Sequence, residues 1–84
     1  MPVAQTSLQA YASIKNLGLN QRIVLAAIKQ HPLSSNEDIA AVLGWTINRV
    51  TPRTNELRAA GLVRIGGTKR SRVTGMKVQW MEAA

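Results

Sequence analysis

Residues 40–63, AAVLGWTINRVTPRTNELRAAGLV, indicate two helices joined by a very short turn. Gly44 can adopt the left-handed conformation that ends the first helix, and Thr46 can cap the start of the second. Only Trp45 lies between them. Two helices connected so closely form a helix-turn-helix, and this motif decides the fold.

The second of these helices, expected over 46–60 and ended by Gly61, has an apolar and a polar side. At about 100° per residue, one side is expected to be buried. This side comprises Ile47, Val50, Thr54 and Leu57. The opposite side cannot belong to the core, and it comprises Asn48, Arg49, Pro52, Asn55 and Ala59.

Pro52 lies inside this helix. A proline there removes the hydrogen bond to the Asn48 carbonyl and crowds it, at a cost of about 3 kcal/mol deep inside a helix. The cost falls if 46–51 form a separate first turn and Thr51 caps the remainder, because proline suits the first position of a helix. We therefore expect a kinked or two-part helix.

Further elements flank the motif on both sides. Residues 8–17 repeat an apolar residue every three positions, as in a short N-terminal helix. Asn20 is the expected cap of a helix that ends before Pro32. Ser35 and Asp38 form a capping box for the next helix, whose buried residues are expected to be Ile39, Val42 and Leu43.

After Gly61 the apolar period changes to two, which predicts strands at 62–67 and 76–81 joined by a basic hairpin tip. We expect Trp80 to belong to the core, as we do Trp45 in the turn between the helices. The predicted fold class is mostly α with a small β hairpin. It is a single domain over 1–84, with flexible ends at 1–5 and 82–84.

The charge of the chain is strongly segregated. Its net charge is +7, and eight of its eleven basic residues lie within 49–77, where Glu56 is the only acid. Such segregation favours a polyanion-binding face over a uniformly solvated surface. An ordinary solvated or polar surface is the alternative for these residues.

Other function classes are disfavoured by composition. The chain has no cysteine and a single histidine, so we expect no enzyme activity, no metal site and no cofactor. No apolar run approaches the roughly 20 residues that span a bilayer, and no signal peptide is recognisable. We expect a cytoplasmic protein without a membrane or small-molecule partner.

The quoted region also resembles winged helix-turn-helix regulators of the MarR type. The shared features over about 11–81 are IA..LG, EL...GLV and a basic hairpin, the wing. INRVTPRTNELRAAGLV, followed by RSRVTG and a late tryptophan, is similar to small winged-helix proteins of phages and prophages. The resemblance implies that 46–60 enters the major groove of DNA and that the wing, 66–75, reaches phosphates or the minor groove.

The candidate DNA contacts follow from side-chain chemistry. Arg can bond guanine O6 and N7 together and Asn can pair with adenine, so Arg49 and Asn48 are the expected base contacts. Thr46 and Thr51 are expected on phosphates. Arg53 is a further candidate, although it could instead pair with Glu56 or Asp38. The candidates in the wing are Lys69, Arg70 and Arg72.

The sequence predicts a sequence-specific double-stranded DNA-binding protein that acts as a transcriptional regulator of phage or prophage type. Two alternatives stay open. One is an interaction module that binds or inhibits a host protein, and the other is a reader of unusual nucleic-acid structure using Asn48, Pro52 and a wing tryptophan. Whether the protein is a homodimer also stays open.

Overall fold

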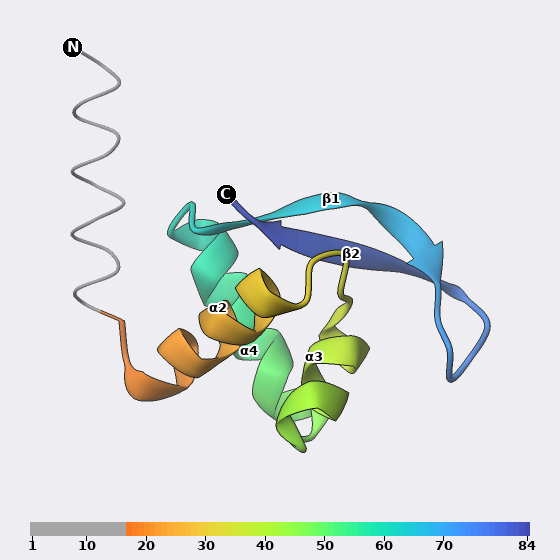
Figure 1. Ribbon diagram of the computed structural model, residues 1–84, viewed down its shortest axis with the longest axis horizontal. Helices are drawn as coiled ribbons and strands as arrows, with labels where there is room; N and C mark the ends of the chain where they lie inside the picture. Colours follow the sequence, from red (N-terminus) through yellow and green to blue (C-terminus); the bar gives the residue numbers. More distant parts are fainter. Residues whose placement is uncertain (1–16) are drawn as a thin grey trace, which may run out of the picture.

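The computed structural model describes residues 17–84, which form three helices followed by a two-stranded antiparallel sheet (Figure 1). The elements are α2 (Leu19–Gln30), α3 (Asn36–Leu43), α4 (Ile47–Ala59), β1 (Val63–Arg70) and β2 (Lys77–Ala83). This order confirms the predicted fold class. The expected N-terminal helix lies outside the described residues, apart from Leu17, which packs against the core.

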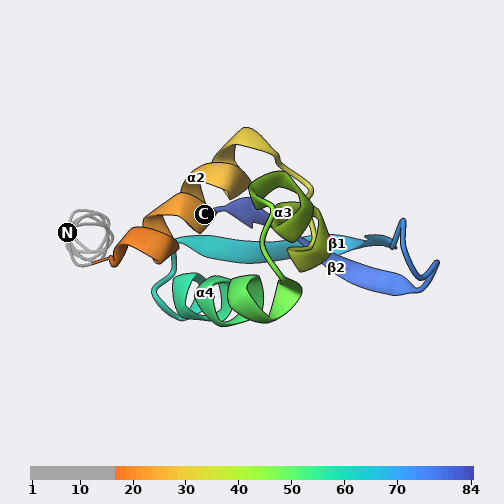
Figure 2. The same ribbon diagram turned by 90° about the horizontal axis from the view of Figure 1, so that it is seen from below.

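The base of the hairpin lies between α2 and α4, and its far end projects beyond the helices (Figure 2). The core draws residues from every element, and its largest fully buried members are Val24, Ile28, Ile39, Val50, Leu57 and the polar Thr54. Met81 brings β2 into the same core, at 2% exposure. The core therefore anchors the hairpin at its base.

The start of α2 differs from the prediction. Gly18, not Asn20, is the N-cap. Its N–H donates to Oε1 of Gln21 at 2.8 Å, so a side chain from within the first turn satisfies a backbone donor at the start of the helix. The helix therefore begins after Gly18 and includes Leu19 and Asn20. The end of α2 at His31, before Pro32, is as predicted.

The capping box at the start of α3 is confirmed. The Asp38 N–H donates to Oγ of Ser35 at 3.3 Å, and the Ser35 N–H donates to Oδ2 of Asp38 at 3.0 Å. Ile39 is buried as expected, but Val42 is 47% exposed. Ala40 takes its place in the core, because three short helices around a small sheet cannot cover a wide apolar stripe.

The turn between α3 and α4 is fixed by backbone hydrogen bonds. Gly44 has φ 68°. Its N–H donates to the Ala41 carbonyl at 3.3 Å, and the Trp45 N–H donates to the Ala40 carbonyl at 3.0 Å. This pair of bonds is a Schellman motif. Thr46 then caps α4 by position, although its side chain makes no capping bond.

The end of α4 repeats this arrangement. Gly61 has φ 78° and donates to the Arg58 carbonyl, while the Leu62 N–H donates to the Leu57 carbonyl, each at 3.0 Å. Leu57 and Leu62 are both buried, as is common for the two apolar positions that flank such a motif. The chain therefore enters β1 directly from the core.

Of the two predicted forms of the recognition helix, the two-part form is wrong, and the kinked form stays a prediction. α4 is continuous from Ile47 to Ala59, and both Thr51 and Pro52 lie within it. Val50 before the proline and Leu57 after it are both 0% exposed, so core packing holds both halves in one helix. Asn48, whose carbonyl loses its donor, is exposed and open to water.

The two strands contain a bulge at Gly66. Ile65 pairs with Met81 and Gly67 pairs with Trp80, so Gly66 is the extra residue of β1. A Cβ on Gly66 would lie only 2.1 Å from Cζ3 of Trp80. The ring of Trp80 therefore covers the glycine backbone, and the prediction that Trp80 belongs to the core is wrong, because Met81 occupies that position.

The C-terminal end is part of the sheet. Ala83 pairs with Val63 in the register of the two strands. The Ala84 N–H donates to the Leu62 carbonyl at 3.0 Å. Residues 82–84 therefore complete the hairpin base, and their expected flexibility stays a prediction.

Substitution Pro52→Ala should raise the free energy of unfolding by roughly 1 to 3 kcal/mol, because alanine restores the donor to the Asn48 carbonyl in a continuous helix. Chemical denaturation measures this. Asn55→Ala, at an exposed position of the same helix, is the control and should change stability by less than about 0.5 kcal/mol. A loss of stability in Pro52→Ala would contradict the continuous helix.

Gly66→Ala should lower the free energy of unfolding by about 1 kcal/mol, because the new methyl group displaces the ring of Trp80 from the bulge. The same substitution in a Trp80→Ala background should cost less, since the obstructing ring is gone. Thermal unfolding of wild type, the two single variants and the double variant gives the coupling free energy between positions 66 and 80. Equal costs in both backgrounds would argue against this contact.

Candidate nucleic-acid interface

The exposed side of α4 is the one predicted from its periodicity. Asn48, Arg49, Pro52, Asn55 and Ala59 are all exposed, while Val50, Thr54 and Leu57 are buried. Ile47 departs from the prediction, because it is 44% exposed. The first turn of the helix therefore presents a polar surface with one apolar side chain at its start.

Arg49 does not project freely into solvent. Its guanidinium carbon lies 3.8 Å from the centroid of the Trp45 ring, a cation–π stack. Trp45 is partly buried and packs against the core, as predicted. The arginine is thus supported by a side chain that belongs to the turn before its own helix.

The two candidate threonines have different surroundings. Thr46 is exposed at the N-cap. Thr51 is partly buried, and its hydroxyl accepts from Nδ2 of Asn36 at 3.5 Å. Asn36 in turn accepts from Oγ1 of the buried Thr54 at 2.9 Å. This polar link between α3 and α4 was not predicted, because Thr54 has an apolar position in the helical pattern.

Arg53 forms the ion pair that was the alternative to DNA contact. Its Nε donates to Oε1 of Glu56 at 2.7 Å, and a second guanidinium nitrogen donates to Oε2 at 3.1 Å. These bonds, with one from Gln21 on α2, hold the pKa of Glu56 below its ordinary value. Glu56 therefore joins α4 to Gln21 of α2, and Arg53 pairs with it within α4.

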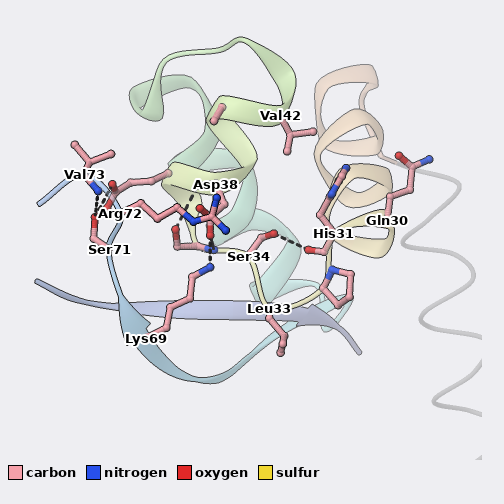
Figure 3. Close-up of a pocket in the computed structure, with 14 residues that line it drawn as sticks. Gln30, His31, Leu33, Ser34, Asp38, Val42, Lys69, Ser71, Arg72 and Val73 are labelled. Atoms are coloured by element: carbon pink, nitrogen blue, oxygen red, sulfur yellow. Dashed lines mark hydrogen bonds and ion pairs between the residues drawn. The ribbon is translucent and has the colours of Figure 1, made fainter. Parts of the chain in front are cut away.

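The hairpin is also attached near its tip, to the start of α3. The ammonium group of Lys69 pairs with Oδ2 of Asp38 (Figure 3). The hydroxyl of Ser71 donates to Oε2 of Glu37 at 2.9 Å. Burial raises the pKa of Asp38, but hydrogen bonds from Lys69 and Ser35 outweigh burial, so the pKa lies below its ordinary value.

This attachment closes one side of an open groove of about 520 Å³ between the 30–35 turn, α3 and the wing (Figure 3). Leu33 and Val42 are the exposed apolar side chains of its helical side. The groove thus separates the helical body from the wing except where Lys69 and Ser71 bridge it. A third bond, from the Met81 N–H to the Ser34 carbonyl at 2.9 Å, ties β2 to the turn before α3.

The hairpin tip is shorter than predicted, because Lys69 and Arg70 belong to β1 and the loop comprises 71–76. Ser71 orders it: its hydroxyl accepts from the N–H groups of Val73 and Thr74, each at 3.1 Å. Nη1 of Arg70 donates to the Gly75 carbonyl at 3.0 Å. The loop is a hydrogen-bonded structure in which Val73 is 81% exposed, while the exposed Arg72 lines the groove and points toward α3 (Figure 3).

The carboxylates divide the basic residues into two groups. Of the four acids, Asp38, Glu56 and Glu82 pair with Lys69, Arg53 and Arg64, and Glu37 accepts from Ser71. Within residues 17–84, the cations of α4 and the wing without a carboxylate partner are Arg49, Arg58, Arg70, Arg72 and Lys77. Those on the exposed first turn of α4 and on the outer wing are the best placed for an anion.

Lys77 was missed as a candidate because it precedes the apolar residues of its strand. It pairs directly with Arg70 across the hairpin. Like charges directly opposite each other on neighbouring strands are destabilising. The outer wing therefore holds two positive charges side by side.

A helix-turn-helix followed by an antiparallel hairpin defines a winged helix-turn-helix protein. A family model described as winged helix-turn-helix DNA-binding matches residues 19–64. This is more than half of the chain, and the chain belongs to that family. The matched region runs from the start of α2 into β1. A comparison with curated proteins found no match.

None of the helices within residues 17–84 combines the length and the apolar character that a membrane crossing requires. In the same part of the chain, no group of three or more histidine, cysteine or acidic side chains could hold a metal ion.

Asp38→Asn should lower the free energy of unfolding at pH 7 by about 1 kcal/mol, because it removes the ion pair with Lys69. The folded-state pKa of Asp38 is below its ordinary value of 3.8. Its contribution is therefore complete above that value and is lost as the pH falls through the folded-state pKa.

Denaturation at pH 7 and at pH 3 measures this difference. The gap between wild type and Asp38→Asn should narrow at pH 3. Glu82→Gln is the control, since its partner Arg64 has a side chain that is 67% exposed, and the effect should stay below about 0.5 kcal/mol. A gap that widens in acid would contradict the assignment.

Proposed function

We propose that this protein is a sequence-specific double-stranded DNA-binding protein that acts as a transcriptional regulator in the cytoplasm. The single observation that carries the proposal is the position of Arg49. It lies in the first turn of α4, exposed, stacked on Trp45 and without a carboxylate partner among residues 17–84. In this class of fold, the N-terminal residues of the recognition helix meet the base edges.

In the proposed complex, the first turn of α4 lies in the major groove. Arg49 contacts guanine and the exposed Asn48 contacts adenine, each contact contributing roughly 1 to 3 kcal/mol of discrimination. Thr46, at the N-cap, is placed for a phosphate at the positive end of the helix dipole. Thr51 and Arg53 have smaller roles, because both are engaged within the protein.

The wing contributes affinity rather than sequence preference. Arg70, Arg72 and Lys77 are the proposed contacts to phosphates or the minor groove. Lys69 was expected to contact DNA, but it is not proposed as a contact because its charge pairs with Asp38. It would set the direction of the wing relative to α4.

The phage or prophage origin is the finer part of the proposal. It rests on the similarity of INRVTPRTNELRAAGLV and RSRVTG to small winged-helix proteins of that source. A homodimer on inverted half-sites is proposed with it, since a two-fold arrangement of protein is matched by a palindromic site.

The proposal is tested by selecting bound sites from a random duplex pool with wild type, Arg49→Ala and Arg72→Ala. Wild type should select a defined motif. Arg49→Ala should relax one position of it, whereas Arg72→Ala should weaken all sites alike and lower the slope of log affinity against log salt by about 1. Lys29→Ala, at the end of α2, is the control and should change neither.

Two outcomes would overturn the proposal. A pool that stays random would remove sequence specificity, and preferential binding to an altered duplex would then favour a reader of nucleic-acid structure. Failure to bind DNA at moderate salt would favour a protein-interaction module. Inverted repeats in the selected motif would support the homodimer, and a single asymmetric motif would contradict it.

A further inference from the structure

Trp45 is constrained on several sides within the three-residue turn between α3 and α4. Its N–H closes the Schellman motif of α3 by donating to the Ala40 carbonyl at 3.0 Å. One residue later Thr46 begins α4, and the Val50 N–H donates to the Thr46 carbonyl at 3.3 Å. The backbone of Trp45 is therefore held by helices on both sides.

The ring of Trp45 is held as well. It is partly buried and packs against the core. Trp45 directly precedes the N-cap and Val50 is the fourth residue of α4, the positions of a hydrophobic staple. Moving the ring would require the turn to open or the staple to separate, so its orientation is fixed before any ligand arrives.

Arg49 rests on this fixed ring. A guanidinium stacked on an aromatic face keeps its N–H donors at the edge of its plane, where they can bind another group. Arg49 has no competing carboxylate within residues 17–84. The long side chain is thereby ordered in advance, which reduces the entropy lost when it binds.

We propose that Trp45 is a positioning residue that holds the Arg49 guanidinium ready to read a guanine in the major groove. This rests on the proposed function and deepens it. Arginine offers only donors. Guanine presents two acceptors in the groove, O6 and N7, whereas adenine presents one acceptor and one donor, so a fixed planar fork matches guanine and rejects adenine.

The proposal distinguishes an arginine that reads a base from one that binds a phosphate. The two differ in how binding depends on side-chain orientation and on charge. A phosphate contact depends on charge, and it tolerates lysine and a mobile side chain. A bidentate base contact depends on the plane and orientation of the guanidinium. Loss of the Trp45 ring should therefore reduce discrimination at one base pair while leaving the dependence of binding on salt unchanged.

The experiment compares wild type, Trp45→Leu, Trp45→Phe, Arg49→Lys and the control Trp80→Leu on two duplexes. One duplex carries the selected site, and the other has adenine in place of the guanine at the position that Arg49→Ala relaxes. The readout is the ratio of the two dissociation constants, together with the salt slope. Circular dichroism and thermal unfolding check that each variant is folded.

In wild type the ratio should be at least tenfold. Trp45→Leu, which keeps an apolar side chain in the core, should reduce it about fivefold, and Trp45→Phe should reduce it about twofold. Arg49→Lys should reduce it about fivefold with an unchanged salt slope, because an ammonium keeps the charge and the donors but loses the planar fork. Trp80→Leu should leave the ratio unchanged.

A ratio maintained in both Trp45 variants would overturn the inference and leave the proposed function intact. A ratio maintained in Arg49→Lys would also overturn it, and this exposed variant does not depend on the folding of the turn. If Trp45→Leu does not fold, Trp45→Phe and Arg49→Lys decide the matter. Absence of any selected motif in wild type would instead be a failure of the proposed function.

Discussion

The hydrogen bond from the Trp45 N–H to the Ala40 carbonyl is the contact on which the rest of the structure depends most. It ends α3 and leaves only Thr46 before α4 begins, so the two helices cannot change their relative direction independently. That constraint orients α4 so that Val50 and Leu57 point into the core and the first turn of the helix stays exposed. The same turn places the Trp45 ring under Arg49.

The electrostatics of the protein follow from how few acids it has. Its four carboxylates all accept bonds from side chains of other residues, and three of them hold α4, β1 or β2 in place. The cations of Arg53, Arg64 and Lys69 are thereby used within the fold. The charge that remains available is concentrated on the first turn of α4 and the outer wing, where Arg70 and Lys77 lie opposite each other at a cost to stability.

Helix ends and strand periods could be predicted because they depend on local chemistry. Ser35 with Asp38, Gly44 and Gly61 each fixed a boundary through hydrogen bonds or left-handed backbone that only a few residue types allow. The start of α2 was misplaced because the side chain of Gln21 can satisfy a donor before Asn20. The continuity of α4 through Pro52 was also missed, because buried residues on both sides outweigh the local preference.

Part of the candidate site followed from the sequence alone. The polar side of α4, the presence of a basic wing and the excess of positive charge depend on composition and on a period that every helix shares. Which cations stay unpaired was decided by tertiary structure, because Lys69 meets Asp38 across 31 residues of sequence. Trp80 lies outside the core because the adjacent Met81, on the opposite face of β2, is the residue that packs into it, and the period of two cannot say which face of a strand is buried.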